Sequence, residues 1–365
     1  MRIVVKLGTT TLTDGTHHLS PPLLIEIARQ FSQLQAAGHQ VILVSSGAIA
    51  SGRARLDFPQ LPKDIPAKQM LAAVGQPRLI AAYEQIFEHY GLIAAQVLLT
   101  GMDLASRKGY LNARNTLIAL MEHKIIPIVN ENDTVATDEI RVGDNDNLSA
   151  LVSNLVDADW LILLTDQPGL YTADPRVDPQ AQLVEEITDR EIVPELWQAA
   201  GGSGHGPGTG GMTTKLQAAD LARRSGACCV IASGKEPNVL VRIAEGERLG
   251  TRFPPIATSV ESRKRYILSA RHAPGRLSVD DGAAKALQRG GSLLAVGITA
   301  VNGAFERGDT VRVILSDGIE IARGIVNYDS DDLAKIIGCS SREIESILGY
   351  HFGDEVIHRN DLVLL

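Results

Sequence analysis

The sequence has few cysteines and no sulfur-based metal motif. Its 365 residues include three cysteines, an odd number with no spacing typical of a zinc site: Cys228, Cys229 and Cys339. The adjacent pair lies in the apolar run 227–232, so we expect both thiols in a buried core strand. A site built on cysteine ligands is therefore not predicted.

A basic net charge and long apolar runs are also missing. The formal net charge is −8, whereas nucleic acids and anionic membranes select proteins with a basic face. No apolar run approaches the length that spans a bilayer, and residues 1–6 enter a strand-like segment without the features of a leader peptide. We therefore expect a cytoplasmic protein that contacts no membrane and no nucleic acid.

Five short aliphatic runs predict a buried parallel sheet. They are continuously apolar rather than alternating, as strands covered on both faces are. The runs are residues 3–5, 41–44, 125–129, 160–164 and 228–231. Helical spacing recurs between them, over residues 22–37, 71–90, 112–122 and 148–156. This order predicts an α/β domain with a doubly wound, mostly parallel sheet.

The pattern changes after Phe253-Pro254-Pro255. A basic patch, Arg263-Lys264-Arg265, precedes short alternating segments at 310–314 and 320–325 that predict strands. We assign residues 1–255 to the α/β domain, 256–274 to a linker and 275–365 to a second, smaller, mostly β domain.

Polar or small residues follow each of the five runs. In open α/β sheets ligands bind beyond the carboxyl ends of the strands, so these residues outline one continuous site. They are Lys6-Leu7-Gly8-Thr9-Thr10, Ser45-Ser46-Gly47-Ala48, Asn130-Glu131-Asn132-Asp133, Thr165-Asp166 and Ala232-Ser233-Gly234.

The stretch 130–147 is rich in oxygen ligands and contains no histidine or cysteine. Carboxylates and amides suit Mg²⁺, which proteins usually share with substrate phosphates. They also suit a small zwitterion, whose ammonium needs acceptors and whose carboxylate needs donors. Two surface turns rich in Asn and Asp are the structural alternative.

A glycine loop at 206–211 precedes a helix that we expect to begin near Thr213. The loop matches G-x-G-x-x-G, but it does not directly follow a strand, and Lys215 does not lie in a P-loop sequence. The helix start could still offer backbone N–H groups to a phosphate; a flexible linker is the alternative. Lys215, which we expect at the surface, opposes the helix dipole by about 0.3 to 1 kcal/mol, a violation that is typical of functional sites.

Lys6, Lys215, the glycine loop and the acidic stretch together favour phosphoryl transfer, which depends mainly on positioning and charge neutralisation. A carboxylate acceptor needs no general base, because it is already ionised at neutral pH. A serine nucleophile is poorly supported, since Ser45-Ser46-Gly47-Ala48 is not G-x-S-x-G and no strand-end cluster contains histidine.

Together and in this order, the motifs resemble the amino acid kinase family, in particular its members that phosphorylate glutamate in the first step of proline biosynthesis. The tail from about Gly275 resembles a PUA domain, so the resemblance covers essentially the whole chain. Ser45 departs from the family pattern, where threonine is common. The matching segments are residues 5–9, 45–50, 130–133, 142–150, 163–174 and 208–220.

The resemblance implies ATP-dependent phosphorylation of the side-chain carboxylate of L-glutamate, with Mg²⁺. Lys6 and Lys215 would stabilise the transferring phosphoryl group, and Asp146 would hold the two lysines. The implied glutamate-binding residues are Ser46, Gly47, Ala48, Asp133 and Asn145. The implied ATP-binding residues are Lys6, Thr165, Asp166, Thr209, Gly210, Gly211, Met212, Thr213, Thr214 and Lys215.

The resemblance also implies feedback inhibition by proline, a homo-oligomer, and hand-over of the acyl phosphate to glutamate-5-semialdehyde dehydrogenase. A kinase for another acceptor, such as N-acetylglutamate, aspartate, carbamate or a nucleoside monophosphate, is the nearest alternative. An RNA-binding or RNA-modifying protein acting through the PUA-like tail is another. Residues 276–365 hold nine Lys and Arg against fourteen Asp and Glu, a net of −5, which disfavours phosphate binding by the tail.

Overall fold

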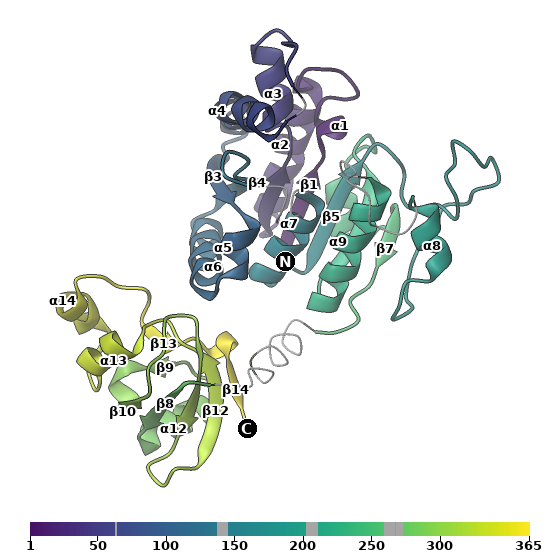
Figure 1. The fold of residues 1–365 in the computed structure, drawn as a ribbon. Helices are drawn as coiled ribbons and strands as arrows, with labels where there is room; N and C mark the ends of the chain where they lie inside the picture. The colour runs from purple at the N-terminus through teal and green to yellow at the C-terminus, as the bar shows by residue number, and fades with distance from the viewer. Residues whose placement is uncertain (63, 137–144, 202–210, 259–266, 268–272) are drawn as a thin grey trace. The chain divides into compact units, whose positions relative to one another are not determined.

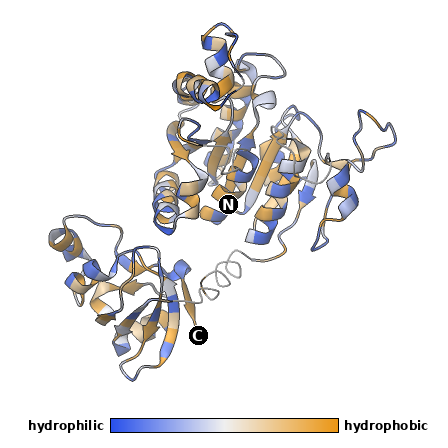
Figure 2. Cartoon of the chain, in the orientation of Figure 1, coloured by the Kyte–Doolittle hydropathy of each residue, from blue (hydrophilic) through white to orange (hydrophobic). Residues whose placement is uncertain are grey.

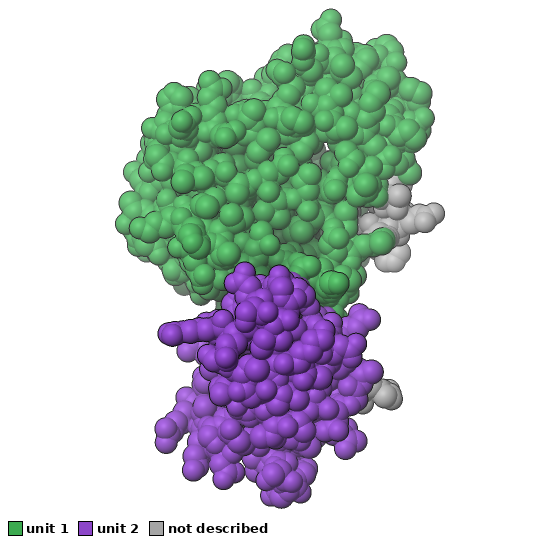
Figure 3. All heavy atoms as spheres, turned by 90° about the vertical axis from the view of Figure 1, so that its left-hand side faces the viewer, with its two compact units in different colours: residues 1–259 green, residues 260–365 purple. Residues whose placement is uncertain are grey.

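The computed structural model describes residues 1–62, 64–136, 145–201, 211–258, 267 and 273–365. The chain divides into two compact units, Met1–Ser259 and Val260–Leu365, which Figure 3 draws in green and purple. Among the described residues, no helix combines the length and the apolar character needed to cross a bilayer.

A seven-stranded sheet forms the centre of the larger unit (Figure 1). Its strands are β1 (Arg2–Leu7), β2 (Gln40–Ser45), β3 (Ile93–Leu99), β4 (Ile125–Glu131), β5 (Trp160–Thr165), β6 (Cys228–Ser233) and β7 (Thr251–Phe253). The spatial order is β3-β4-β2-β1-β5-β6-β7. Strands β1 to β6 pair in parallel, and β7 pairs antiparallel with β6. The doubly wound, mostly parallel sheet that the sequence predicted is confirmed.

Helices cover both faces of this sheet, because alternate residues of each buried strand point to opposite sides. The helices are α1 (Thr9–Leu12), α2 (Pro21–Ala36), α3 (Ala48–Arg55), α4 (Ile65–Glu88), α5 (Gly101–Ala105), α6 (Arg107–Glu122), α7 (Asn145–Leu155), α8 (Pro194–Ala199), α9 (Met212–Ser225) and α10 (Val239–Ala244). On one face Val4 joins a core with α6, α7 and α9. On the other, Ile3 and Val5 join a core with α2, α4 and α10. Figure 2 shows the resulting apolar strands between helices of mixed polarity.

The five predicted apolar runs all form strands, and the buried thiols of Cys228 and Cys229 lie in β6 as expected. The four helical stretches are also present as α2, α4, α6 and α7. The sequence reading missed β3 and β7. Strand β3 lies at the sheet edge, where Ile93 and Gln96 are exposed, so it lacks the continuous apolar signal of a central strand.

The sheet topology places a crevice at the end of β1. The chain passes from β1 to β2 on one side and later returns to β5 on the other side. This reversal is the topological switch point at which open α/β sheets bind ligands. Residues at the carboxyl ends of β1, β2, β4 and β5 therefore face a shared space.

The smaller unit is built mainly from antiparallel strands. They are β8 (Gly275–Val279), β9 (Leu293–Leu294), β10 (Ile298–Asn302), β11 (Thr310–Ile314), β12 (Glu320–Ile325), β13 (Glu355–Ile357) and β14 (Leu362–Leu364). Its helices are α12 (Asp281–Gln288), α13 (Ser330–Ile336) and α14 (Ile344–Leu348). Five strands form a sheet in the order β10-β8-β11-β12-β14, and β13 pairs with β9. The strands predicted at 310–314 and 320–325 have those bounds.

Two glycines let α3 and α4 cross in backbone contact beside the crevice. A Cβ atom on Gly75 of α4 would overlap the carbonyl oxygen of Ala48 and the amide nitrogen of Gly52 in α3. A Cβ atom on Gly52 would overlap the carbonyl oxygen of Leu71. Helix α3 begins directly after Gly47, so this crossing fixes the position of the loop that follows β2.

We predict that Gly75→Ala lowers the free energy of unfolding by about 1 to 3 kcal/mol, because the added methyl group forces the two helix backbones apart. Chemical denaturation of this variant, of wild type and of Ala73→Ser tests the prediction. Ala73 is exposed on the same helix, so its variant should stay within about 0.5 kcal/mol of wild type. Equal stability of Gly75→Ala and wild type would contradict the close crossing.

Candidate active site

Lys6 occupies the end of the central strand β1 with its side chain buried. The residue is 3% exposed, and its ammonium group forms an ion pair with Asp146 Oδ1. Asp146 lies in the first turn of α7 and is fully buried. A carboxylate at this position interacts favourably with the positive end of the helix dipole. The end of β1 therefore places the Lys6 ammonium group beside the negative charge of Asp146.

Lys215 reaches the same carboxylate from the first turn of α9. Its Nζ atom lies 3.1 Å from Asp146 Oδ2, and the Thr214 hydroxyl oxygen lies 2.8 Å from that oxygen. Lys215 is 7% exposed, so the expectation that it lies at the surface was wrong. The cost of placing a cation at a helix start is offset here by a buried partner of opposite charge.

The three charged groups form a buried cluster with a formal charge of +1. Burial alone would raise the pKa of Asp146, but the charges of Lys6 and Lys215 outweigh burial and hold that pKa below its ordinary value. Asp146 is thus ionised at neutral pH and keeps two ammonium groups together. The remaining positive charge suits an anion at the neighbouring crevice.

A cleft of about 830 Å³ opens beside this cluster. It is lined by residues from the ends of β1, β2, β4 and β5 and from the starts of α3, α7 and α9, so four of the five predicted strand-end clusters line one cleft. The fifth cluster, Ala232-Ser233-Gly234 at the end of β6, does not line it. Eleven of the residues to which the resemblance assigns a catalytic or binding role line it: Lys6, Ser46, Gly47, Ala48, Asp133, Asn145, Thr165, Asp166, Gly211, Met212 and Lys215.

The other predicted site residues have different positions. Asp146 lies behind the cleft, beneath the two lysines. Thr213 donates a hydrogen bond to the carbonyl oxygen of Ala200 at 2.7 Å, and Thr214 contacts Asp146, so neither is among the described residues that line the cleft. Thr209 and Gly210 lie outside the described residues.

On one side of the cleft, Asn145 bridges the ends of β2 and β4. Its Nδ2 atom lies 2.9 Å from both Ser46 Oγ and Asn130 Oδ1. Gly47 precedes α3 with a φ of 106°, a conformation that favours glycine, and so turns the backbone into the helix start. Burial raises the pKa of the Asp133 carboxyl, which lines the same side of the cleft.

On the other side, Thr165 and Asp166 end β5 next to the start of α9. The Thr165 hydroxyl donates to Asp166 Oδ1 at 3.0 Å, and Asp166 itself is exposed. Helix α9 has no side-chain cap at Gly211. Because the first N–H groups of a helix have no partner within the helix, this helix start remains a candidate anion site.

Sequence reasoning did not assign several residues that line the cleft, including Arg53, Tyr171 and Arg176. Arg53 lies in the last turn of α3, and Arg176 pairs with Asp174 in the loop after β5. Isolated arginines in a helix and a loop carry no motif signal, because exposed arginine is common at both places. Only the folded chain brings them to the cleft.

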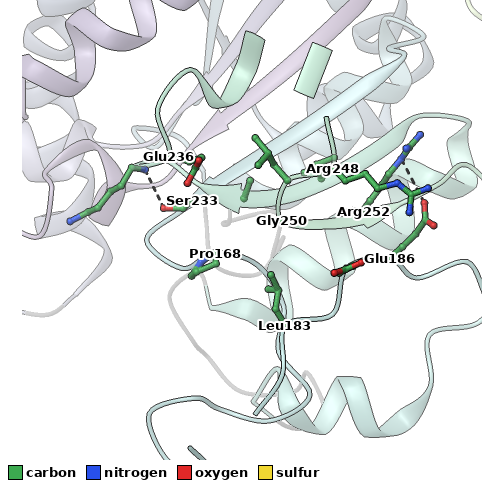
Figure 4. Close-up of a pocket in the computed structure, with 13 residues that line it drawn as sticks. Pro168, Leu183, Glu186, Ser233, Glu236, Arg248, Gly250 and Arg252 are labelled. Carbon is green, nitrogen blue, oxygen red and sulfur yellow. Dashed lines mark hydrogen bonds and ion pairs between the residues drawn. The ribbon is translucent and has the colours of Figure 1, made fainter. Parts of the chain in front are cut away.

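A second cavity of about 450 Å³ lies along β6 and β7 (Figure 4). Val230 and Ala232 line it, and its charged residues are balanced: Glu185, Glu186, Glu236, Lys235, Arg248 and Arg252. Arg252 lies 3.9 Å from Glu186, and Glu236 pairs with Arg242. Ala232 and Ser233 of the fifth strand-end cluster line it, but it contains none of the residues that the resemblance assigns to catalysis or substrate binding, and it has no excess positive charge. We therefore place the active site in the larger cleft.

The larger cleft contains carboxylate oxygens that could contribute to a metal site. Its acidic lining residues are Glu131, Asp133, Asp166 and Asp174. Within the described part of the chain, no three His, Cys, Asp or Glu side chains gather closely enough to hold a metal ion. The donor set fits a hard cation that takes most of its ligands from a bound phosphate.

A doubly wound sheet with two lysines beside a cleft at its switch point is typical of a protein that transfers phosphoryl groups. Comparison with known proteins supports this class. Residues 1–233 match the amino acid kinase family, and residues 275–348 match the PUA domain. The chain belongs to the amino acid kinase family.

Two relatives that match the full length of this chain are named glutamate 5-kinase. Glutamate 5-kinase of Photobacterium profundum is 56% identical over 100% of this chain and 96% of its own length. Glutamate 5-kinase of Deinococcus radiodurans is 52% identical over 100% of both chains. Among solved structures, a UMP kinase from Bacillus anthracis aligns with a TM-score of 0.49 and 16% identity over 70% of this chain and 96% of that chain.

We predict that the buried cluster makes stability depend on pH. Because the folded-state pKa of Asp146 is depressed, its contribution is present above the ordinary value of 3.8 and is lost as pH falls through the folded-state value. Asp146→Asn should lose about 3 to 5 kcal/mol at neutral pH, since it leaves two buried lysines unpaired. Its unfolding free energy should then fall less than that of wild type on further acidification.

Denaturant unfolding at several pH values measures both quantities. The control is Glu84→Gln, which removes an exposed carboxylate from α4 and should follow the wild-type curve. If Asp146→Asn also follows that curve, the pairing of Asp146 with the two lysines does not contribute to stability.

Proposed function

We propose that this protein transfers the γ-phosphoryl group of ATP to the side-chain carboxylate of L-glutamate, forming L-glutamyl 5-phosphate and ADP in the first step of proline biosynthesis. The observation that carries the proposal is the convergence of Lys6 and Lys215 on one buried carboxylate beside a cleft. The full-length similarity to proteins named glutamate 5-kinase supports this choice of acceptor.

Glutamate is assigned to the side of the cleft with Ser46, Gly47, Ala48, Asp133 and Asn145. An amino acid acceptor brings an ammonium group, and Asp133 offers a partly desolvated carboxylate for it. The start of α3 offers backbone N–H groups for a carboxylate. These complementary charges favour free glutamate over an acceptor whose amino group is blocked.

ATP is assigned to the side with Thr165, Asp166 and the start of α9. The uncapped N–H groups after Gly211 suit its phosphates. Met212 also lines this side, and the proposed segment continues back to Thr209 and forward to Lys215. With the two substrates on opposite sides, the terminal phosphate would meet the acceptor near Lys6 and Lys215.

The chemistry requires charge neutralisation rather than proton removal. A carboxylate oxygen of glutamate forms a bond to the γ-phosphorus, the bond from that phosphorus to the β–γ bridging oxygen breaks, and ADP leaves with the electron pair. The acceptor is already ionised at neutral pH, so no general base is needed. Lys6 and Lys215 would offset the repulsion between the two anions and stabilise the charge on the transferring group.

We assign Mg²⁺ to the phosphates of ATP, with Asp166 as its candidate protein carboxylate. Such an ion usually takes one or two carboxylates and completes its shell with phosphate oxygens and water. When bound, it would neutralise phosphate charge that the lysines do not reach.

Regulation and partners follow from the same assignment. We infer feedback inhibition by proline, which shares an amino group and a carboxylate with glutamate and ends the pathway. We also infer a homo-oligomer, and hand-over of the labile acyl phosphate to glutamate-5-semialdehyde dehydrogenase. RNA binding by the tail is disfavoured by its net charge of −5, from nine Lys and Arg against fourteen Asp and Glu in residues 276–365.

The direct test is an ADP-release assay with ATP, Mg²⁺ and a panel of acceptors. Wild type should release ADP with glutamate and not with N-acetylglutamate, aspartate, carbamate or UMP, and proline should reduce the rate.

Lys215→Ala should lower kcat by at least about 10³-fold, in the range seen when a group that stabilises transition-state charge is removed. Lys235→Ala, which removes an exposed lysine paired with Asp14, should remain near wild type.

Turnover with another acceptor, or none with glutamate, would refute the substrate assignment. Glutamate-dependent turnover that is unchanged in a folded Lys215→Ala variant would instead remove Lys215 from the mechanism.

We predict a pH-dependent affinity for glutamate that depends on Asp133. Its carboxyl must be ionised to bind an ammonium group, and burial raises its pKa, so kcat/KM for glutamate should fall as pH decreases toward that raised pKa. Asp133→Asn should raise KM for glutamate and abolish this acid limb, with KM for ATP little changed. The measurement is kcat/KM for glutamate against pH in wild type and in Asp133→Asn. If the variant shows the same loss at low pH, a group other than Asp133 causes that loss.

A further inference from the structure

A chain of amide side chains extends from the cleft to the edge of the sheet. Asn145, at the start of α7, donates to Asn130 Oδ1 at 2.9 Å. Asn130, at the end of β4 and 2% exposed, donates to Gln76 Oε1 of α4 at 2.8 Å. Gln76 in turn donates to Gln96 Oε1 of β3 at 2.9 Å. Neither Gln76 nor Gln96 belongs to any motif recognised in the sequence.

Backbone groups fix which way the two asparagine amides point. The Glu131 amide N–H, which can only donate, lies 2.9 Å from Asn130 Oδ1. The Ser45 carbonyl oxygen, which can only accept, lies 3.3 Å from Asn145 Nδ2. The Nδ2 group of Asn130 must therefore face α4, where Gln76 Oε1 accepts from it.

This arrangement leaves Asn145 Oδ1 buried and without a hydrogen-bond partner among the described residues. A buried acceptor without a partner costs free energy, which a donor on a bound ligand can recover. Asn145 lines the cleft on the same side as Asp133. An ammonium group of the acceptor would supply the missing donor.

We propose that Gln76 is a positioning residue for the acceptor amino acid: it accepts from Asn130 and so holds the Asn130 and Asn145 amides in the orientation that presents Asn145 Oδ1 to the substrate. This inference rests on the proposed function. Gln76 does not line the cleft, so it acts through Asn130 rather than by touching the substrate. Loss of its oxygen leaves a buried N–H of Asn130 without an acceptor, and the amide pair then loses its fixed orientation.

The test compares steady-state kinetics of wild type, Gln76→Met, Gln76→Glu and Gln96→Met. Gln76→Met keeps the side-chain length but removes the acceptor, and should raise KM for glutamate by about tenfold, the effect of one unsatisfied buried donor. Its kcat and its KM for ATP should stay within about twofold of wild type, because the lysine cluster is untouched. Gln76→Glu retains an oxygen that accepts from Asn130 and should restore most of the affinity.

Gln96→Met removes the outer contact at the exposed sheet edge and should leave KM for glutamate within about twofold of wild type, since Asn130 keeps its acceptor. An unchanged KM in Gln76→Met, a failure of Gln76→Glu to improve on it, or an equal loss in Gln96→Met would each overturn the positioning role. Failure of wild type to release ADP with glutamate would overturn the proposed function itself, so the two failures are distinguishable.

Discussion

The ion pairs of Lys6 and Lys215 with the single buried carboxylate of Asp146 are the constraint on which the site depends. Two ammonium groups repel each other, and burial makes the repulsion stronger. One carboxylate between them holds both in place and still leaves one positive charge uncompensated. The switch point of the sheet makes this geometry possible, because the end of β1 and the start of α9 both bring a lysine to Asp146 at the start of α7. The cluster therefore depends both on the strand order of the sheet and on the identity of these three residues.

The cleft beside the cluster offers two kinds of contact to its ligands: backbone N–H donors and side-chain oxygen acceptors. Backbone N–H groups at the starts of α3 and α9 suit anionic groups without bringing further side-chain charge. The side chains of Asp133 and Asn145 supply acceptors, one of them an amide oxygen without a partner among the described residues. A kinase that joins two anions needs this separation: cations between the reacting groups, and oxygen acceptors only where the substrate is positive. The α3 and α4 crossing and the amide chain through Gln76 hold the acceptor side in place.

The central strands and most of the cleft residues could be predicted from the sequence, because burial and sheet topology leave local patterns in it. Central strands are buried on both faces, so apolar runs locate β1, β2, β4, β5 and β6, and the polar residues that follow them must meet at one edge. Strand β3 was missed because an edge strand carries a weaker apolar signal. The burial of Lys215 was missed because local sequence cannot show that Asp146 lies opposite it. The resemblance to a known family supplied that pairing. Gln76 has no local signal, since a glutamine in a helix is ordinary until folding places it against Asn130.

The central claim is that both ammonium groups act on one terminal phosphate opposite a bound amino acid. A crystal structure of the protein with glutamate, Mg²⁺ and a non-hydrolysable ATP analogue measures this most directly, through the distances from the two lysine Nζ atoms to the γ-phosphate oxygens. The account predicts that both nitrogens lie within hydrogen-bonding distance, about 3 Å, with the glutamate side chain on the opposite side of the phosphorus from ADP. A γ-phosphate that reaches neither Lys6 nor Lys215, or a glutamate bound elsewhere, would contradict it.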